Sequence, residues 1–94
     1  MEIYNVVFKK KLGNEFKKLP KQVVSKLAAW IDAVKHDGLS QTRKIPGYHD
    51  EPLKGNRKGQ RSIRLSKSYR AIYVINSSGQ MELVEIIEVN KHDY

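Results

Sequence analysis

The chain has 94 residues and no cysteine, and its 18 Lys and Arg residues outnumber its 10 Asp and Glu residues, which gives a formal net charge of +8. A chain of this length buries one core, so we predict a single domain over residues 1–94. The lack of cysteine excludes disulfides, thiolate catalysis and Cys-based zinc sites. No apolar run reaches the roughly 20 residues of a membrane-spanning helix, and residues 1–4 do not resemble a signal peptide. We therefore expect a cytoplasmic protein with no membrane partner.

The N-terminal part of the chain predicts one strand and two helices. Residues 2–8 are rich in β-branched and aromatic residues, which favours a strand. Residues 9–19 favour a short basic helix, although Gly13 weakens it. Pro20 is well placed to open a second helix, and Gly38 to end it. This second helix is predicted by apolar residues at helical spacing, which are Val23, Leu27, Trp30, Ile31 and Val34.

The C-terminal part predicts a long connection and three strands. Residues 39–59 contain two prolines and three glycines with few apolar residues, so we expect an exposed connection. Residues 60–66, 70–76 and 81–89 then favour strands joined by short polar turns. The expected fold is α+β in the order β-α-α-β-β-β. Two N-terminal helices should cover one face of a small, mainly antiparallel sheet and leave the other face partly open.

Positive charge is concentrated in the middle of the sequence. Residues 43–70 hold nine basic residues against Asp50 and Glu51, a balance of +7. Residues 71–94 hold Lys91 against four acids, a balance of −3. Such a distribution favours a polyanionic partner such as nucleic acid. Composition alone leaves open the alternative of a merely solvated surface.

Two arginines in the predicted hairpin are candidate phosphate ligands. Alternation along residues 61–65 assigns Arg64 to the face opposite Ile63, and Arg70 begins the next strand. A guanidinium group offers a planar pair of donors that matches phosphate oxygens. The alternative is that these arginines form ordinary surface ion pairs with Glu82, Glu85 or Glu88.

Glu51 and His92 are the candidate acid–base residues. A carboxylate among arginines is kept ionised by their charge and can accept a proton. His92 follows the last predicted strand and could donate one, although a frayed terminal residue is the simpler interpretation. Together with phosphate-binding arginines they could promote attack of an RNA 2′-OH on its own phosphate without a metal ion or other cofactor.

The remaining histidines and tyrosines carry weaker predictions. His36 suits the C-terminal turn of a helix and is predicted to be structural. His49 could be a second base or a solvated loop residue. The three histidines do not have metal-ligand spacing. Three tyrosines are possible platforms for base stacking, namely Tyr48, Tyr69 and Tyr94.

The sequence contains, in this order, the segments KKLPKQV, EPLKGNRKGQRSIRL, YRAIYVI and VEIIEVNKHDY. In this arrangement they resemble the RelE/HigB superfamily of toxins from bacterial toxin–antitoxin modules, which have the RelE/ParE fold. The resemblance covers nearly the whole chain. It implies an mRNA interferase, a ribosome-dependent endoribonuclease that enters the A site and cuts messenger RNA without a metal ion. The implied partners are the ribosome with its messenger and ribosomal RNA, and a cognate antitoxin.

The resemblance also implies roles for individual residues. Glu51, just before the P-L-K-G turn, matches an acid–base position, and Arg70 matches the arginine that holds the scissile phosphate. Arg64 lies near a lysine position, and His92 matches a terminal His or Arg position. The expected RNA-binding residues are Lys54, Arg57, Lys58, Arg61 and Tyr94.

Two alternatives to the nuclease remain open. The ParE branch of the same fold poisons DNA gyrase and lacks this acid–base set. A nucleic-acid-binding module without catalysis would also explain the charge. The joint presence of Glu51, Arg64, Arg70 and His92 favours the nuclease over the gyrase poison.

Overall fold

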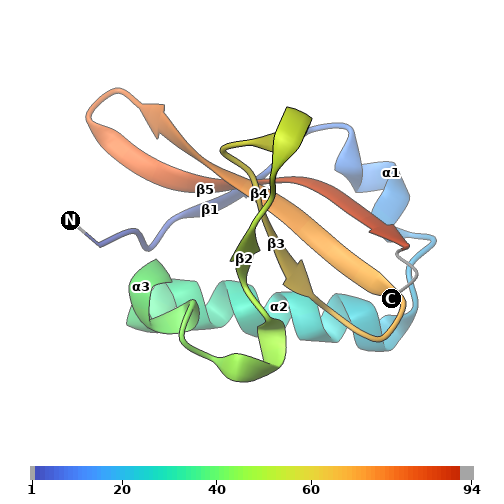
Figure 1. The fold of residues 1–94 in the computed structure, drawn as a ribbon. Helices are drawn as coiled ribbons and strands as arrows, with labels where there is room; N and C mark the ends of the chain where they lie inside the picture. Colours follow the sequence, from blue (N-terminus) through green and yellow to red (C-terminus); the bar gives the residue numbers. More distant parts are fainter. Residues whose placement is uncertain (1, 92–94) are drawn as a thin grey trace.

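The computed structural model describes residues 2–91 as a five-stranded sheet with helices packed on one face (Figure 1). The fold class is α+β, as the sequence predicts. The elements in chain order are β1 (Val6–Phe8), α1 (Leu12–Phe16), α2 (Lys21–Asp37), α3 (Leu39–Thr42), the 3-10 turn η1 (Pro46–Tyr48), β2 (Glu51–Pro52), the 3-10 turn η2 (Gly55–Arg57), β3 (Arg61–Arg64), β4 (Tyr69–Ser78) and β5 (Met81–Lys91).

The strand order in the sheet is β1-β5-β4-β3-β2. Strand β1 is parallel to β5, whereas every other neighbouring pair is antiparallel. The long β4–β5 hairpin therefore occupies the middle of the sheet, and the short strands β1 and β2 lie at its two edges. In the part of the chain that is described, no helix is long and apolar enough to cross a membrane.

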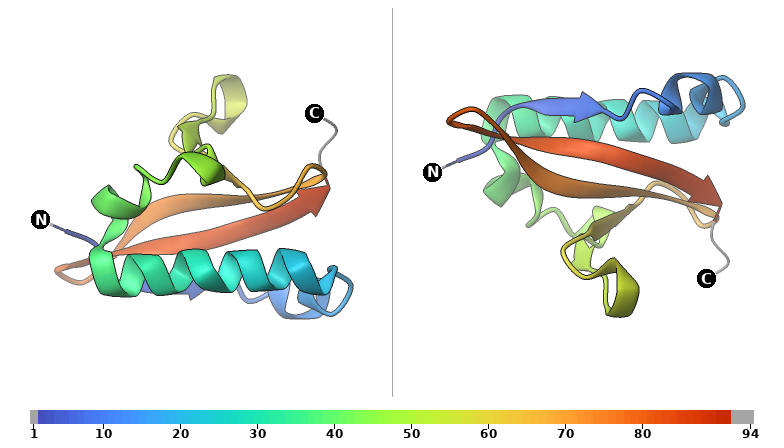
Figure 2. Two further views of the ribbon diagram at one scale, coloured as in Figure 1. Left: turned by 90° about the horizontal axis from the view of Figure 1, so that it is seen from below. Right: turned by 90° about the horizontal axis from the view of Figure 1, so that it is seen from above.

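Helix α2 is the main cover of the sheet and lies along one face (Figure 2). Its buried residues Val23, Leu27, Trp30 and Val34 recur every three or four positions, which gives the helix a single apolar stripe. The Trp30 ring packs against the Tyr73 ring of β4 at a centroid distance of 5.1 Å. This stripe and the inward residues of β3, β4 and β5 form the core.

The prediction of an exposed connection over residues 39–59 is wrong in part. Leu39, Thr42 and Tyr48 are buried, because α3 and η1 pack beside α2 instead of extending into solvent. This burial could not be predicted, since the buried residues are scattered between polar ones and show no regular spacing. Tyr48 is also wrong as a stacking platform, because it is 6% exposed and its hydroxyl donates to the backbone oxygen of Lys26 at 3.3 Å.

The second face of the sheet is partly covered by the segment from β2 to η2, which lies on the side away from α2 (Figure 2). Ile72 of β4 points to this second face and has no exposed surface, although it does not belong to the core under α2. Its partners in the sheet are Ser62 and Glu88. On the second face, Ile72 is therefore a buried apolar side chain between a polar and a charged one.

A bulge in β5 determines which of its residues face each side. Ile72 pairs with Glu88 but Tyr73 pairs with Ile86, so Ile87 is the extra residue. The bulge shifts the alternation by one position. As a result Val89 faces the core, and Glu88 faces the second side of the sheet.

Candidate functional site

Arg64 and Arg70 are directly opposite each other on β3 and β4. Directly opposed residues in an antiparallel pair share a face and have Cβ atoms about 4.5–5.5 Å apart. Two guanidinium groups side by side on one face offer planar pairs of donors that match phosphate oxygens, so this pair is the strongest candidate for an anion-binding position in the described part of the chain.

A chain of hydrogen bonds continues from Arg70 across the second face. The Arg70 Nε donates to Asn90 Oδ1 at 3.4 Å, and the Asn90 side-chain amide donates to the Glu88 carboxylate. Arg57 donates to the other oxygen of Glu88 at 2.7 Å. Glu88, one of the carboxylates expected as alternative partners of the hairpin arginines, therefore pairs with Arg57.

Asn90 is not among the residues predicted from the sequence, and Glu88 is predicted only as an ion-pair partner of the hairpin arginines. Strict alternation along β5 would place Glu88 and Asn90 on the core side of the sheet, away from Arg64 and Arg70. The bulge at Ile87 places them on the arginine face instead, and it leaves no clear mark in the sequence.

Glu51 lies on the same face as the two arginines. It pairs with Ser62 in the β2–β3 ladder, and Ser62 is two residues before Arg64 on β3. Glu51 and Arg64 are therefore diagonal neighbours, which typically lie about 7–8 Å apart and are within reach of long side chains. Glu51 is exposed, so its carboxylate is accessible from solvent.

Asp50 anchors the strand that carries Glu51. Its side chain has no exposed surface and accepts hydrogen bonds from Arg61 Nε at 2.7 Å and from the Tyr73 hydroxyl at 2.6 Å. Burial, together with the bond to Asp50, raises the pKa of Tyr73 to about 12. Tyr73 therefore keeps its proton and donates to Asp50 throughout the ordinary pH range. Arg43 in turn donates to the Tyr73 hydroxyl at 3.3 Å.

Four of the five predicted RNA-binding residues are among the described residues, and their surroundings are of three kinds. Lys54 and Lys58 are exposed on either side of η2, and Arg57 is half-buried in its ion pair with Glu88. Arg61 alternates with Ser62, so it points away from Arg64 and pairs with Asp50. Its contacts are those of an anchoring residue.

His92 and Tyr94 lie outside the described residues. Lys91, the last residue of β5, pairs with Tyr69, one position beyond the pairing of Arg70 with Asn90. Tyr69 is half-buried against the core. His49 is exposed after η1 with a φ of 47°, and His36 Nδ1 lies 2.8 Å from the backbone oxygen of Asp32 in the last turns of α2.

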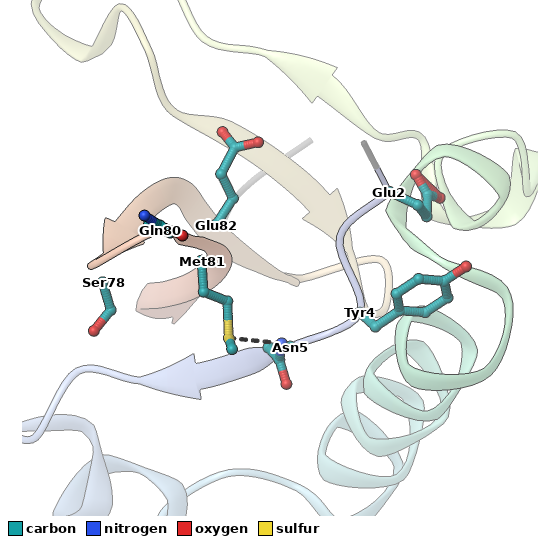
Figure 3. A pocket seen from close by; sticks show the side chains of 7 residues that line it. All are labelled: Glu2, Tyr4, Asn5, Ser78, Gln80, Met81 and Glu82. Carbon is teal, nitrogen blue, oxygen red and sulfur yellow. Dashed lines mark hydrogen bonds between the residues drawn. The ribbon is translucent and has the colours of Figure 1, made fainter.

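One hollow in the surface is far from the arginine pair. It has a volume of about 670 Å³ and lies where the N-terminal segment meets the tip of the β4–β5 hairpin (Figure 3). Glu2, Tyr4 and Glu82 are among its lining residues, and Asn5 Nδ2 donates to Met81 Sδ at 3.1 Å. Arg70 lies at the opposite end of β4 and Arg64 pairs with it from β3, and neither arginine lines this hollow. No group of His, Asp and Glu side chains among residues 2–91 is arranged to hold a metal ion.

No protein-family model matches the sequence, and no curated protein matches it. Solved structures do match over almost the full length of the chain. The toxin–antitoxin complex RelBE2 from Mycobacterium tuberculosis is 27% identical, covers 96% of this chain and 99% of its own, and has a TM-score of 0.59. A YoeB/ParE toxin from Agrobacterium tumefaciens is 22% identical over 94% of this chain and 98% of its own, with a TM-score of 0.64.

A third match is the archaeal RelE–RelB complex from Pyrococcus horikoshii, which is 19% identical over 97% of this chain and 96% of the matched chain, with a TM-score of 0.67. These proteins share a helix-covered sheet with the chain described above. The fold of the chain is therefore that of the RelE/ParE-like toxins, which is the fold that the resemblance of its sequence predicts.

Proposed function

We propose that the protein is the toxin of a toxin–antitoxin module and acts as a ribosome-dependent mRNA endoribonuclease. The observation that supports this best is the cross-strand pair Arg64 and Arg70, with Glu51 as a diagonal neighbour on the same face. A phosphate held by the arginines would lie within reach of a carboxylate that can accept a proton.

The proposed reaction uses side chains alone. Glu51 accepts the proton of the RNA 2′-OH, whose oxygen then attacks the adjacent phosphorus. Arg64 and Arg70 stabilise the negative charge that develops on the phosphate oxygens. The 5′-oxygen leaves with a proton donated by His92. The products are a 2′,3′-cyclic phosphate and a 5′-OH.

The rest of the second face would hold RNA on either side of the reacting phosphate. Lys54 and Lys58 are exposed next to η2 and can contact phosphates as point charges. Arg57 already bridges to Glu88, so its contribution would include fixing that carboxylate near Asn90. The ribosomal A site in the cytoplasm and a cognate antitoxin are the proposed partners, and Tyr94 is a proposed RNA contact.

Single-turnover cleavage of messenger RNA on programmed ribosomes tests this proposal. Glu51→Gln should slow cleavage by about 10²–10⁴, the usual contribution of a general base. Glu82→Gln is a matched control, because Glu82 is also an exposed carboxylate on a strand but lies at the far end of the hairpin. Equal cleavage by the Glu51→Gln protein and the wild type would contradict the assignment of Glu51.

Primer extension on cellular mRNA after brief induction distinguishes the proposed nuclease from its alternatives. The nuclease should produce cuts at codons in the reading frame. DNA breaks that depend on gyrase, without mRNA cuts, would instead identify a ParE-like poison. Binding without any cleavage would identify a nucleic-acid-binding module.

A further inference from the structure

Strand β2, which carries Glu51, is a short strand at the edge of the sheet. It pairs with β3 at two positions, those of Glu51 and Pro52. Pro52 has no backbone N–H and cannot donate to β3. The backbone N–H of Leu53 adds a bond to the backbone oxygen of Gln60 at 2.9 Å. So short a ladder leaves the direction of the Glu51 side chain dependent on contacts outside it.

Asp50, the residue before β2, makes such contacts. Its carboxylate has no exposed surface and accepts hydrogen bonds from Arg61 Nε at 2.7 Å and from the Tyr73 hydroxyl at 2.6 Å. Its backbone oxygen also accepts a bond from Arg61 Nη2 at 3.5 Å. Arg61 belongs to β3 and Tyr73 to β4, so two neighbouring strands hold the chain directly before Glu51.

Tyr73 connects Asp50 to the core of the protein. Its ring is fully buried and packs against the Trp30 ring of α2 at a centroid distance of 5.1 Å. Its hydroxyl accepts a hydrogen bond from Arg43 Nε, directly after α3, at 3.3 Å and donates its own proton to Asp50. The hydroxyl is therefore fixed by the ring on one side and by two polar partners on the other, and it fixes the Asp50 carboxylate in turn.

We propose that Tyr73 is a positioning residue for RNA cleavage, which acts on Glu51 through Asp50. This inference rests on the proposed function, in which Glu51 accepts the proton of the RNA 2′-OH. Tyr73 has no exposed surface, so it cannot contact RNA itself. A displacement of a catalytic group by about 1 Å can reduce a rate by about 10². A buried hydrogen bond that determines where Glu51 lies therefore contributes to the rate from a distance.

The alternative is that the Tyr73 hydroxyl only stabilises the fold. Loss of a hydrogen bond to a buried carboxylate lowers stability wherever Glu51 points. This alternative predicts an unchanged cleavage rate for any variant that is still folded. A positioning role predicts a slower rate, and it predicts that the loss disappears when residue 51 no longer accepts a proton.

A double-mutant cycle, measured by single-turnover cleavage on saturating programmed ribosomes, separates these two roles. Tyr73→Phe removes the hydroxyl and keeps the ring that packs against Trp30. It should slow cleavage by at least about tenfold and leave the affinity for ribosomes unchanged. In a protein that already carries Glu51→Gln, the same substitution should cause no further loss, because Tyr73 acts through Glu51.

Tyr48→Phe is the matched control for the loss of a buried hydroxyl. Tyr48 is also buried, but its hydroxyl donates to the backbone oxygen of Lys26 and not to Asp50. This variant should cleave at the wild-type rate. Circular dichroism checks that each variant is folded, and if Tyr73→Phe is not, Arg43→Met takes its place in the cycle, because it removes the other partner of the Tyr73 hydroxyl.

Hydrogen exchange in the free protein gives a measurement that needs no nuclease activity. In Tyr73→Phe the amide of Leu53 should exchange faster, whereas the amides of the β4–β5 hairpin should keep their protection. Faster exchange throughout the sheet would overturn the proposal in favour of a general loss of stability.

The cleavage rates distinguish failure of this proposal from failure of the proposed function. A slow Glu51→Gln protein together with a folded Tyr73→Phe protein that cleaves at the wild-type rate would overturn the positioning role alone. Equal losses from Tyr73→Phe with and without Glu51→Gln would also overturn it, because Tyr73 would then act independently of Glu51. A wild-type rate for Glu51→Gln would overturn the assignment of Glu51 as the base, and the positioning role with it.

Discussion

The two faces of this protein are both basic, but they are built differently. On the sheet face, arginines stand opposite each other, and Arg57 and Arg70 are connected through Glu88 and Asn90. On the helical side, an apolar groove is lined by Phe8, Phe16, Val24, Leu27, Ala28 and Ile31, and the six lysines between residues 9 and 21 are exposed and form no ion pair within residues 2–91. Arginine provides a fixed planar set of donors, whereas lysine is a flexible point charge. The first face is suited to holding a phosphate in one position, and the second to attracting an acidic surface of variable shape.

The largest expected effect tests whether the sheet face depends on its buried anchor. Asp50→Ala should lower the free energy of unfolding by about 3 kcal/mol, because it leaves Arg61 without its partner beside the core. Glu88→Ala, which breaks the half-exposed pair with Arg57, should cost about 1 kcal/mol or less. Urea denaturation measures both. Equal losses would mean that burial does not distinguish the two ion pairs.

The second effect separates the functions of the two faces. Arg70→Ala should reduce single-turnover cleavage by about 10²–10³, the usual result of removing a preorganised donor to a developing negative charge. Lys35→Ala, on the exposed side of α2, removes a positive charge from the helical side and should leave cleavage unchanged. If both substitutions reduce cleavage equally, the contribution of Arg70 is net charge and not phosphate contact.

A smaller effect tests whether Asn90 orients Arg70. Asn90→Ala removes the acceptor at 3.4 Å from Arg70 Nε, and we expect cleavage to fall by about tenfold, or about 1.4 kcal/mol. Asn90→Asp keeps an acceptor for Arg70 but places a carboxylate beside Glu88. It should therefore restore part of the Arg70 contact at some cost in stability. A rate for Asn90→Ala equal to that of the wild type would show that Arg70 needs no partner on β5.

The smallest effect concerns a charge outside both faces. Ser40 donates its hydroxyl and its backbone N–H to Glu2 at 2.7 Å each, and the pKa of Glu2 is lowered chiefly by the hydroxyl bond. The stabilisation is therefore present above the ordinary value of 4.5 and is lost as the pH falls below it. Glu2→Gln should melt below the wild type at neutral pH, and the difference should shrink under acid conditions. A difference in melting temperature that does not change with pH would contradict this, and cleavage should not change.

The elements with local signals could be predicted from the sequence. The apolar stripe of α2, with Pro20 before it and Gly38 after it, depends on a regular spacing that only a helix satisfies. The strands β4 and β5 follow from β-branched residues between short turns. The alternation around Ile63 also assigned Arg64 to the face away from the core, and the register confirms it.

Features that depend on pairing between distant segments became clear only in the folded chain. The opposition of Arg64 and Arg70 requires the register of the β3–β4 ladder, and the position of Glu51 requires the β2–β3 ladder, which has only two residue pairs. The bulge at Ile87 then turned Glu88 and Asn90 toward the arginines. The burial of Asp50 could not be predicted either, because its position next to Glu51 in the sequence does not indicate that Arg61 and Tyr73 donate hydrogen bonds to it. Composition measures how much charge a chain carries, but the face on which each charge lies is fixed by strand register, because a shift of one residue moves a side chain to the other side of the sheet.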